Sequence, residues 1–284
     1  MLRRVHGYLT SRKPEDAPEA SLYLEKYGYV ILRQAFSEAQ VADLKDDIAR
    51  VFQEYPRDNR GGDKRPEDED NMFRYEMYNR SSVCQDAIAH PAILSVIEPL
   101  LGEDCHVIAN TAWRNEAHHE GTHGGQGWHV DAGPHIPLSS GVTWPEDIPH
   151  PVFAIGAHIY LQDCDLDDGP TGVIPGSHLS GRFPPVDRLM DPELDYEGQG
   201  VAPLITKAGD VGLFVSDVWH RRMPAGDTDS GRFFLQVHYA RRDIAQRVRS
   251  TTNTNHVSAQ ASARAQKPRQ KTLIGLHQNM FYDG

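Results

Sequence analysis

The sequence predicts a mainly β protein, an antiparallel double sheet or barrel with helices packed outside it. Two helical patterns lie before residue 103, and strand patterns punctuated by turns such as DDGP, IPGS and AGD follow it. Helices first and strands later is typical of sheets that carry their helices on one face. The chain of 284 residues is long enough for one large domain with a sizeable core.

The two helices are predicted from apolar spacing and from their end signals. The segment YGYVILRQAF (27–36) reads as a strand that leads into the first helix, where Ser37 and Gln40 have capping-box spacing. Apolar residues then recur at helical spacing over about four turns: Val41, Leu44, Ile48, Val51 and Phe52. The second helix is predicted to start near Pro91 and to stop at Gly102, both favoured end positions.

Four strand patterns follow the helices. DCHVIAN (104–110) reads as a short strand, and FAIGAHIYLQ (153–162) alternates so that His158 lies opposite an apolar face. DVGLFVSDVWH (210–220) and RFFLQVHYA (232–240) are rich in β-branched and aromatic residues, and each is predicted as one strand. The polar face of the last strand carries alternate residues: Arg232, Phe234, Gln236, His238 and Ala240.

Two terminal segments flank the predicted domain of residues 21–240. Residues 1–20 read as an N-terminal arm, and residues 241–284 as a basic C-terminal extension with eight Lys or Arg and one acid up to residue 271. Its composition favours a solvated or disordered segment, and the alternative is a flap that orders over the active site. Within the domain, residues 56–71 are charged and broken by glycine and proline, which predicts a mobile loop and a second candidate lid.

Composition narrows the class of protein. The net charge of -11 argues against a general nucleic-acid binder. No apolar run reaches the roughly 18 residues that a membrane span needs, and no apolar core follows the basic N-terminus as a secretory signal would require. Cys84, Cys105 and Cys164 form neither a CxxC pair nor an even disulfide framework, which fits a reducing cytoplasm.

The stretch WHVDAG carries the first chemical signal. It places His129 two residues before Asp131, and on an extended chain such residues point to the same face. The pair alone is weak, because many strands contain one by chance. His220, far along the chain, supplies a second imidazole. Two imidazoles and one carboxylate form the facial triad of non-haem Fe(II) oxygenases, which leaves positions open for a bidentate cosubstrate and O₂.

Two other classes of protein remain open at this point. A zinc hydrolase can use the same ligand types, so a cosubstrate clamp is the discriminating feature. Arg232 lies on the polar face of its strand, where a guanidinium can bind a carboxylate in bidentate fashion. A non-enzymatic binding protein on the same fold is the other alternative. Loss of a metal ligand would indicate it, and none is lost.

The segment IYLQDCDLDDGPTGVIPGSHLSG (159–181) resembles a signature of the phytanoyl-CoA dioxygenase family, through its acidic run, its Gly-Pro step and its IPGSH motif. YLEKYGYVILRQAFSEAQVADL and HPAILSVIEPLLGED resemble the same family, so the resemblance covers roughly residues 22–240. It implies a double-stranded β-helix, a jelly roll of the cupin-like kind. It also implies an enzyme that uses Fe(II), 2-oxoglutarate and O₂.

The resemblance also implies roles for individual residues. The family's HxD…H triad falls on His129, Asp131 and His220 as catalytic metal ligands, and its 2-oxoglutarate-binding arginine falls on Arg232. Related halogenases replace the triad carboxylate with a small residue. Because Asp131 is present, the resemblance favours hydroxylation, or a related desaturation or cyclisation.

Five further residues are pocket candidates by the same resemblance. His158 falls where relatives place a residue near 2-oxoglutarate, and Arg74 where some relatives have a basic or polar pocket residue. Asn110 and Thr111 are expected to line the pocket beside substrate and cosubstrate, but as strand neighbours only one should reach it. Arg222 stands two positions after the second histidine, where relatives often have a small hydroxyl residue, and it suggests an anionic group on the substrate.

The remaining histidines have structural interpretations. His178 in the IPGSH motif is predicted to brace a turn. Several histidines flank the first metal ligands, but no regular spacing supports a second metal site among them: His118, His119, His123 and His135.

The predicted function is therefore oxidation of a small-molecule metabolite by a 2-oxoglutarate-dependent Fe(II) dioxygenase. Hydroxylation of an unactivated C–H bond would release succinate and CO₂. The expected partner is a small molecule, anionic if Arg222 faces it, with neither nucleic acid nor membrane. A monomer or homodimer is expected.

Overall fold

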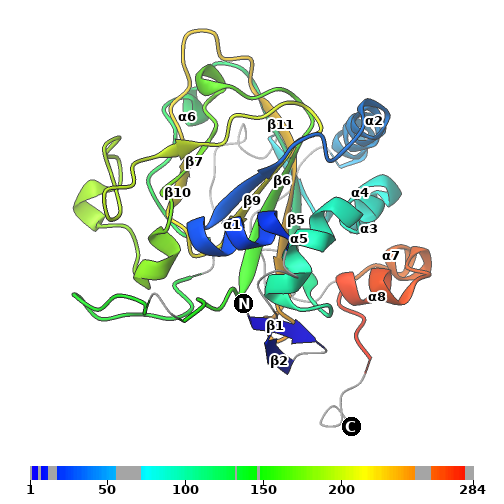
Figure 1. Ribbon diagram of the computed structural model, residues 1–284. Coiled ribbons are helices and arrows are strands. Elements are labelled where there is room, and N and C mark those ends of the chain that lie inside the picture. Colours follow the sequence, from blue (N-terminus) through cyan, green and yellow to red (C-terminus); the bar gives the residue numbers. More distant parts are fainter. Residues whose placement is uncertain are drawn as a thin grey trace.

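Two antiparallel sheets face one another in the computed structural model (Figure 1). The six-stranded sheet has the strand order β3 (Tyr29–Leu32), β9 (Val211–Val215), β6 (Ala154–Tyr160), β11 (Arg232–Ala240), β5 (His106–Asn115) and β4 (Phe73–Tyr75). The three-stranded sheet has the order β10 (His220–Arg222), β7 (Thr171–Val173) and β8 (Ala202–Pro203). The structure describes residues 2–5, 8–11, 18–55, 72–131, 133–145, 148–246 and 257–278.

Eight α-helices occur among the described residues, and all but the short α6, which lies near β7, gather outside the larger sheet. They are α1 (Glu19–Tyr27), α2 (Glu38–Glu54), α3 (Met77–Arg80), α4 (Ser82–Ala87), α5 (Pro91–Leu101), α6 (Glu120–His123), α7 (Ala259–Arg264) and α8 (Pro268–Leu273). Short 3-10 turns are η3 (Leu166–Asp168), η4 (Ser177–Ser180) and η5 (Val186–Arg188). Figure 1 shows α2, α3, α4, α7 and α8 on one side of the sheets, with β7 and β10 on the opposite side. Among the described residues, no helix is long and apolar enough to span a membrane.

Both predicted helices are confirmed, together with their end signals. Ser37 caps α2 because its hydroxyl accepts a hydrogen bond from the Gln40 backbone, while the Gln40 side chain accepts one from the Ser37 backbone. Pro91 occupies the first turn of helix α5, and Gly102 is the C-cap residue at its other end. The predicted N-terminal arm contains a hairpin, in which β1 (Leu2–Val5) pairs with β2 (Tyr8–Ser11).

The main core lies between the helices and the larger sheet. Alternate residues of β6 and β11 face it, as the sequence pattern predicts, and are fully buried: Ile155, Ala157, Ile159, Leu235, Val237 and Tyr239. Burial of each large apolar side chain contributes about 1.5–3 kcal/mol. Because one face of these strands makes the core, the other face can carry polar residues into the space between the two sheets.

The segment DVGLFVSDVWH is two strands rather than the one predicted. Strand β9 belongs to the larger sheet, the chain then turns through residues 216–219, and β10 begins at His220 in the smaller sheet. The turn residues are all buried, and the Trp219 amide donates to Ser177 Oγ at 2.8 Å. Val218 and Trp219 in this turn are apolar and buried like strand residues, so the apolar content of the segment did not reveal the break. His220 therefore opens a strand instead of ending one.

The strand predicted at residues 104–110 is longer than expected. Strand β5 runs on to Asn115, so Asn110 and Thr111 lie in its middle rather than at its end. It pairs with β11 along its full length, from Arg232 opposite Asn115 to Ala240 opposite His106. This long pairing is what brings Thr111 into the interior of the fold.

His178 braces the fold, as predicted. Its buried imidazole lies 3.0 Å, Nε2 to oxygen, from the Glu25 carbonyl, which ties the IPGSH turn to the end of α1. Gly28, in the left-handed region with φ 81°, packs so closely that an added Cβ would lie 2.7 Å from the His178 ring. Burial lowers the pKa of His178 to about 4, so the ring is neutral at pH 7.

The C-terminal extension differs most from its prediction. Residues 257–278 are neither a solvated tail nor a flap over the site, because α7 and α8 pack on the helical side of the fold. Their apolar side chains join the main core: Ala261, Ala265, Leu273 and Ile274. Basic residues pair there with helix acceptors, as Arg269 does with Glu98 at 2.7 Å. Residues 247–256 and 279–284, and the lid predicted at 56–71, lie outside the described residues.

Replacing Leu273 with alanine should lower the free energy of unfolding by about 2–5 kcal/mol, because a fully buried side chain would leave a cavity. Urea denaturation measures this change. The matched control is Leu276→Ala in the same segment, where the side chain is 40% exposed and its loss should matter little. Equal effects from both substitutions would contradict the packing of this segment on the core.

Candidate active site

A cavity of about 510 Å³ opens between the two sheets. Its walls come from the interior faces of β5, β6, β10 and β11, together with the segment that carries His129 and Asp131. A second cavity, of about 690 Å³, lies elsewhere and is lined by Trp144, His150 and Tyr196, among others. The smaller cavity holds all of the predicted metal ligands, so it is the candidate active site.

The three predicted metal ligands meet in this cavity. His129 and His220 exchange two backbone hydrogen bonds of 3.0 Å, an isolated β-bridge that sets their rings side by side. Asp131 Oδ2 lies 3.5 Å from His220 Nε2, and Asp131 Oδ1 lies 4.0 Å from His129 Nε2. One potential ligand atom from each residue lies within 4.8 Å of the other two. This donor set fits a divalent metal such as Fe(II).

Hydrogen bonds behind the ligands orient them for a metal. The Nδ1 atom of His129 lies 2.8 Å from the Gly127 carbonyl, and that of His220 lies 2.9 Å from the Val218 carbonyl. Because a carbonyl only accepts, each Nδ1 carries the proton and each Nε2 keeps its lone pair for a metal. Burial alone would raise the pKa of Asp131, but the nearby imidazoles of His220 and His238 hold it well below its usual range.

Two buried arginines form another part of the cavity. Arg232 on β11 is 7% exposed and Arg222 on β10 is 3% exposed. Among the described residues, no acceptor bonds any guanidinium nitrogen of Arg222 or the Nε of Arg232. Burial, and then the positive charge of Arg232, lower the pKa of Arg222 to about 9. Unpaired buried charges cost several kcal/mol each, so this place fits an anion.

His158 and Thr111 also reach the cavity, where the sequence analysis expects them. His158 Nδ1 lies 3.4 Å from the Thr171 hydroxyl. Burial, and then the charge of Arg232, keep the pKa of His158 well below its ordinary value. His158 is therefore neutral, so one of its ring nitrogens can donate a hydrogen bond and the other can accept one.

Two predicted site residues point away from the cavity, so their assignments are wrong. The Asn110 side chain accepts from the Tyr78 backbone at 2.9 Å and donates to the Gln236 carbonyl at 2.9 Å. Arg74 donates to backbone carbonyls and stacks over the Phe52 ring at 4.2 Å. Both residues are on the helix-facing side of their strands. Their strand neighbours Thr111 and Tyr75, which pair in register, take the cavity face.

A polar group beside the predicted metal ligands was not among the residues predicted from the sequence. The Gln236 amide lies 2.7 Å from His238 Nε2 and accepts a 2.7 Å hydrogen bond from the Trp113 indole. His238 Nε2 is 3.6 Å from Asp131 Oδ2. The alternation of β11 already placed Gln236 and His238 on the polar face with Arg232. That signal was sufficient to find them.

A jelly-roll cavity with two histidines and one carboxylate on one metal-facing side is the architecture of the non-haem iron oxygenases. Residues 24–224 match the family model described as Phytanoyl-CoA dioxygenase (PhyH). The chain belongs to this family, and its double-stranded β-helix fold is confirmed. The family uses Fe(II), 2-oxoglutarate and O₂, so the protein is an oxygenase of this type.

Solved structures with the same fold share little sequence with this chain. The non-heme alpha ketoglutarate dependent carbocyclase SnoK from nogalamycin biosynthesis is 21% identical, with a TM-score of 0.60 over 86% of this chain and 91% of that one. EctD from S. alaskensis is 21% identical, with a TM-score of 0.62 over 85% and 84%. HygX from Streptomyces hygroscopicus, with nickel and 2-oxoglutarate bound, is 15% identical, with a TM-score of 0.58 over 79% and 87%.

Proposed function

We propose that the protein hydroxylates an unactivated C–H bond of a small-molecule metabolite, with release of succinate and CO₂. Desaturation or cyclisation at the same site is the alternative outcome. One observation carries the proposal: a single cavity contains both the metal-ligand group and two buried arginines that lack an anion. A metal site alone would suit a hydrolase equally well. The arginines supply the clamp that a dicarboxylic cosubstrate needs.

His129, Asp131 and His220 would hold Fe(II), which when bound supplies the activation of O₂. The protein's own contribution is to position and shield this group. The carbonyls of Gly127 and Val218 hold both imidazoles in one tautomer. Asp131, which stays ionised, offsets part of the metal charge and leaves no position for a halide. The triad therefore supports oxygenation of the substrate over halogenation.

Arg232 and Arg222 would bind the far carboxylate of 2-oxoglutarate. Arg222 and His220 lie two residues apart on β10, so their side chains share a face and are separated by about 6–7 Å along the strand. That separation suits a short dicarboxylate with one end at the metal and the other at the guanidiniums. The sequence predicts that Arg222 binds the substrate, but we propose that it binds the cosubstrate. Its guanidinium is near enough to Arg232 for their charges to repel.

A succinate-release screen against a metabolite library tests this function. Purified protein loaded with Fe(II) should release succinate in proportion to oxidised product, and only with 2-oxoglutarate, O₂ and a productive small molecule present. Zn(II)-loaded protein is the matched control and should release none. Turnover that proceeds with Zn(II), and without O₂ or 2-oxoglutarate, would identify a hydrolase instead.

A further inference from the structure

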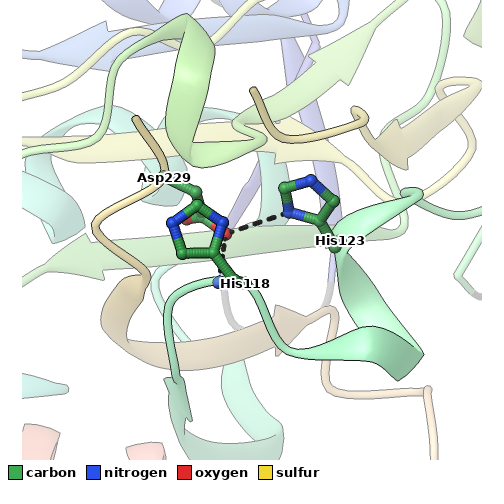
Figure 2. Close-up of side chains that lie close together, drawn as sticks. All are labelled: His118, His123 and Asp229. Carbon is green, nitrogen blue, oxygen red and sulfur yellow. Dashed lines mark hydrogen bonds and ion pairs between the residues drawn. The ribbon is translucent and has the colours of Figure 1, made fainter. Parts of the chain in front are cut away.

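A second group of metal-type ligands lies near the outer end of the cavity. His118 lies just before α6 and His123 is its last residue, in the connection after β5, and Asp229 lies in the connection between β10 and β11. Figure 2 shows both imidazoles beside the Asp229 carboxylate. One ring nitrogen from each histidine and one carboxylate oxygen all lie within 4.8 Å of one another. The same criterion identifies only one other group among the described residues, the triad of the active site.

We infer that His118, His123 and Asp229 form a second metal site, which takes a divalent transition-metal ion of the Zn²⁺ type. Two imidazoles and one carboxylate suit such an ion, whereas Ca²⁺ and Mg²⁺ prefer oxygen ligands. Three protein ligands would leave at least one position for water. The inference does not depend on the proposed oxygenase reaction.

The distances agree with this assignment. Bonds of about 2.0–2.2 Å to nitrogen and carboxylate oxygen in a tetrahedral site place ligand atoms about 3.3 Å apart. His123 Nδ1 already lies 3.4 Å from Asp229 Oδ2, close to the 3.5 Å between His220 and Asp131 in the active site. A shift of the exposed His118 ring, one of whose nitrogens already lies within 4.8 Å of the other two ligand atoms, would complete the site.

The carboxylate is held in place before any metal arrives. The Asp229 side chain is fully buried, and its oxygens accept backbone hydrogen bonds from His118 at 2.9 Å and from Gly231 at 2.8 Å. Those bonds fix its orientation but leave lone pairs for a further ligand. The His123 side chain is 37% exposed, so an ion can reach the group from solvent.

A simpler interpretation is that His123 and Asp229 form a hydrogen bond that closes the loop. It accounts for one histidine but not for the other. The ring of His118 makes no hydrogen bond within the described part of the chain, and its backbone has φ 54°, a conformation that costs a non-glycine residue about 1–3 kcal/mol. That conformation brings its ring within 5.5 Å of the His123 ring, centroid to centroid.

A metal here would join two segments of the cavity wall. The loop that carries His118 and His123 also carries Thr122 and Gln126, which line the cavity. Asp229 lies three residues before Arg232. A metal ion bound by both segments would fix the loop at the cavity edge to the start of β11, the strand that carries Arg232 of the proposed carboxylate clamp.

Calorimetric titration of metal-free protein with Zn²⁺ alone tests the inference without any turnover. Wild-type protein should bind two equivalents. His118→Ala should bind one equivalent tightly and the other at least about tenfold more weakly, because loss of a direct ligand should cost no less than loss of an outer-shell partner. Asp131→Ala should keep the second site and lose the first. His119→Ala is the matched control, since its ring lies outside the group, and it should bind two.

A thermal readout separates the two sites. Zn²⁺ should raise the melting temperature of Asp131→Ala, and the same Zn²⁺ concentration should raise that of Asp131→Ala/His118→Ala by less, because weaker binding to the folded state stabilises it less. Binding of only one equivalent of Zn²⁺ by the wild-type protein would overturn the inference. So would a second equivalent that binds His118→Ala and His119→Ala equally well.

Discussion

Replacing His220 with alanine is expected to abolish substrate-dependent succinate release and to weaken Fe(II) binding. The facial triad has three protein ligands, and removal of His220 would leave only one imidazole and one carboxylate. His220 also forms the backbone bridge with His129, and its ring approaches Asp131 at 3.5 Å. The same loss is expected for His129→Ala and Asp131→Ala. Activity should fall to background in each variant.

Anaerobic equilibrium dialysis against Fe(II) measures the binding, and succinate analysis measures the turnover. The matched control is His119→Ala, which removes an imidazole from the same region without touching the triad. Thermal unfolding of each variant shows whether the fold survives. Full turnover by folded His220→Ala would disprove the metal-ligand assignment.

Replacing Arg232 with leucine is expected to raise the apparent KM for 2-oxoglutarate by at least about tenfold. A hydrogen bond to a charged group contributes about 1.5–3 kcal/mol, and tenfold corresponds to about 1.4 kcal/mol. Fe(II) binding should survive, because Arg232 is not a metal ligand. Arg222→Leu should act in the same direction, since its guanidinium is buried in the same cavity without a partner.

The double variant Arg222→Leu/Arg232→Leu shows whether the two guanidiniums bind one carboxylate. If they share it, the effects of the single substitutions should not add. Arg188→Leu is the charge-matched control, because it removes one positive charge from a surface pair with Asp191. If the KM for 2-oxoglutarate stays unchanged in both single variants and in the double variant, the proposed carboxylate clamp is disproved. If only Arg222→Leu raises the KM for 2-oxoglutarate, Arg222 rather than Arg232 binds the carboxylate.

Local signals in the sequence predicted the elements that local physics determines. The capping box at Ser37, the proline at the start of α5 and the alternation along β11 each depend on neighbours within a few residues. The HxD pair with a distant histidine predicted three candidate metal ligands that the fold brings together, because that donor set is chemically restrictive. These features needed no knowledge of the packing.

Other features depend on contacts between distant segments. The turn between β9 and β10 is buried, so its apolar residues resemble a continuing strand. The choice between Asn110 and Thr111 depends on which face of β5 meets the helices, and Asn110 is held there by Tyr78. Asp229 joins two histidines more than a hundred residues earlier in the chain, and spacing among the histidines alone could not show it.

The C-terminal extension shows how composition can mislead. Its many basic residues predicted a solvated segment. Four small or aliphatic side chains of this segment are nevertheless buried in the main core: Ala261, Ala265, Leu273 and Ile274. The guanidiniums of Arg264 and Arg269 bond to acceptors on that surface, including Gln85 and Glu98. Charge that is paired on a surface does not oppose folding as unpaired charge does.

Anaerobic addition of 2-oxoglutarate to Fe(II)-loaded protein tests the central claim most directly. A 2-oxo acid chelated to Fe(II) gives a visible charge-transfer absorption, which requires both the triad and the clamp to hold their ligands together. The wild-type protein is predicted to develop this absorption with one cosubstrate per protein. Asp131→Ala should not develop it, and Arg232→Leu should need at least about tenfold more 2-oxoglutarate. Wild-type protein that binds Fe(II) and 2-oxoglutarate without the absorption, or Asp131→Ala that develops it fully, would contradict the account.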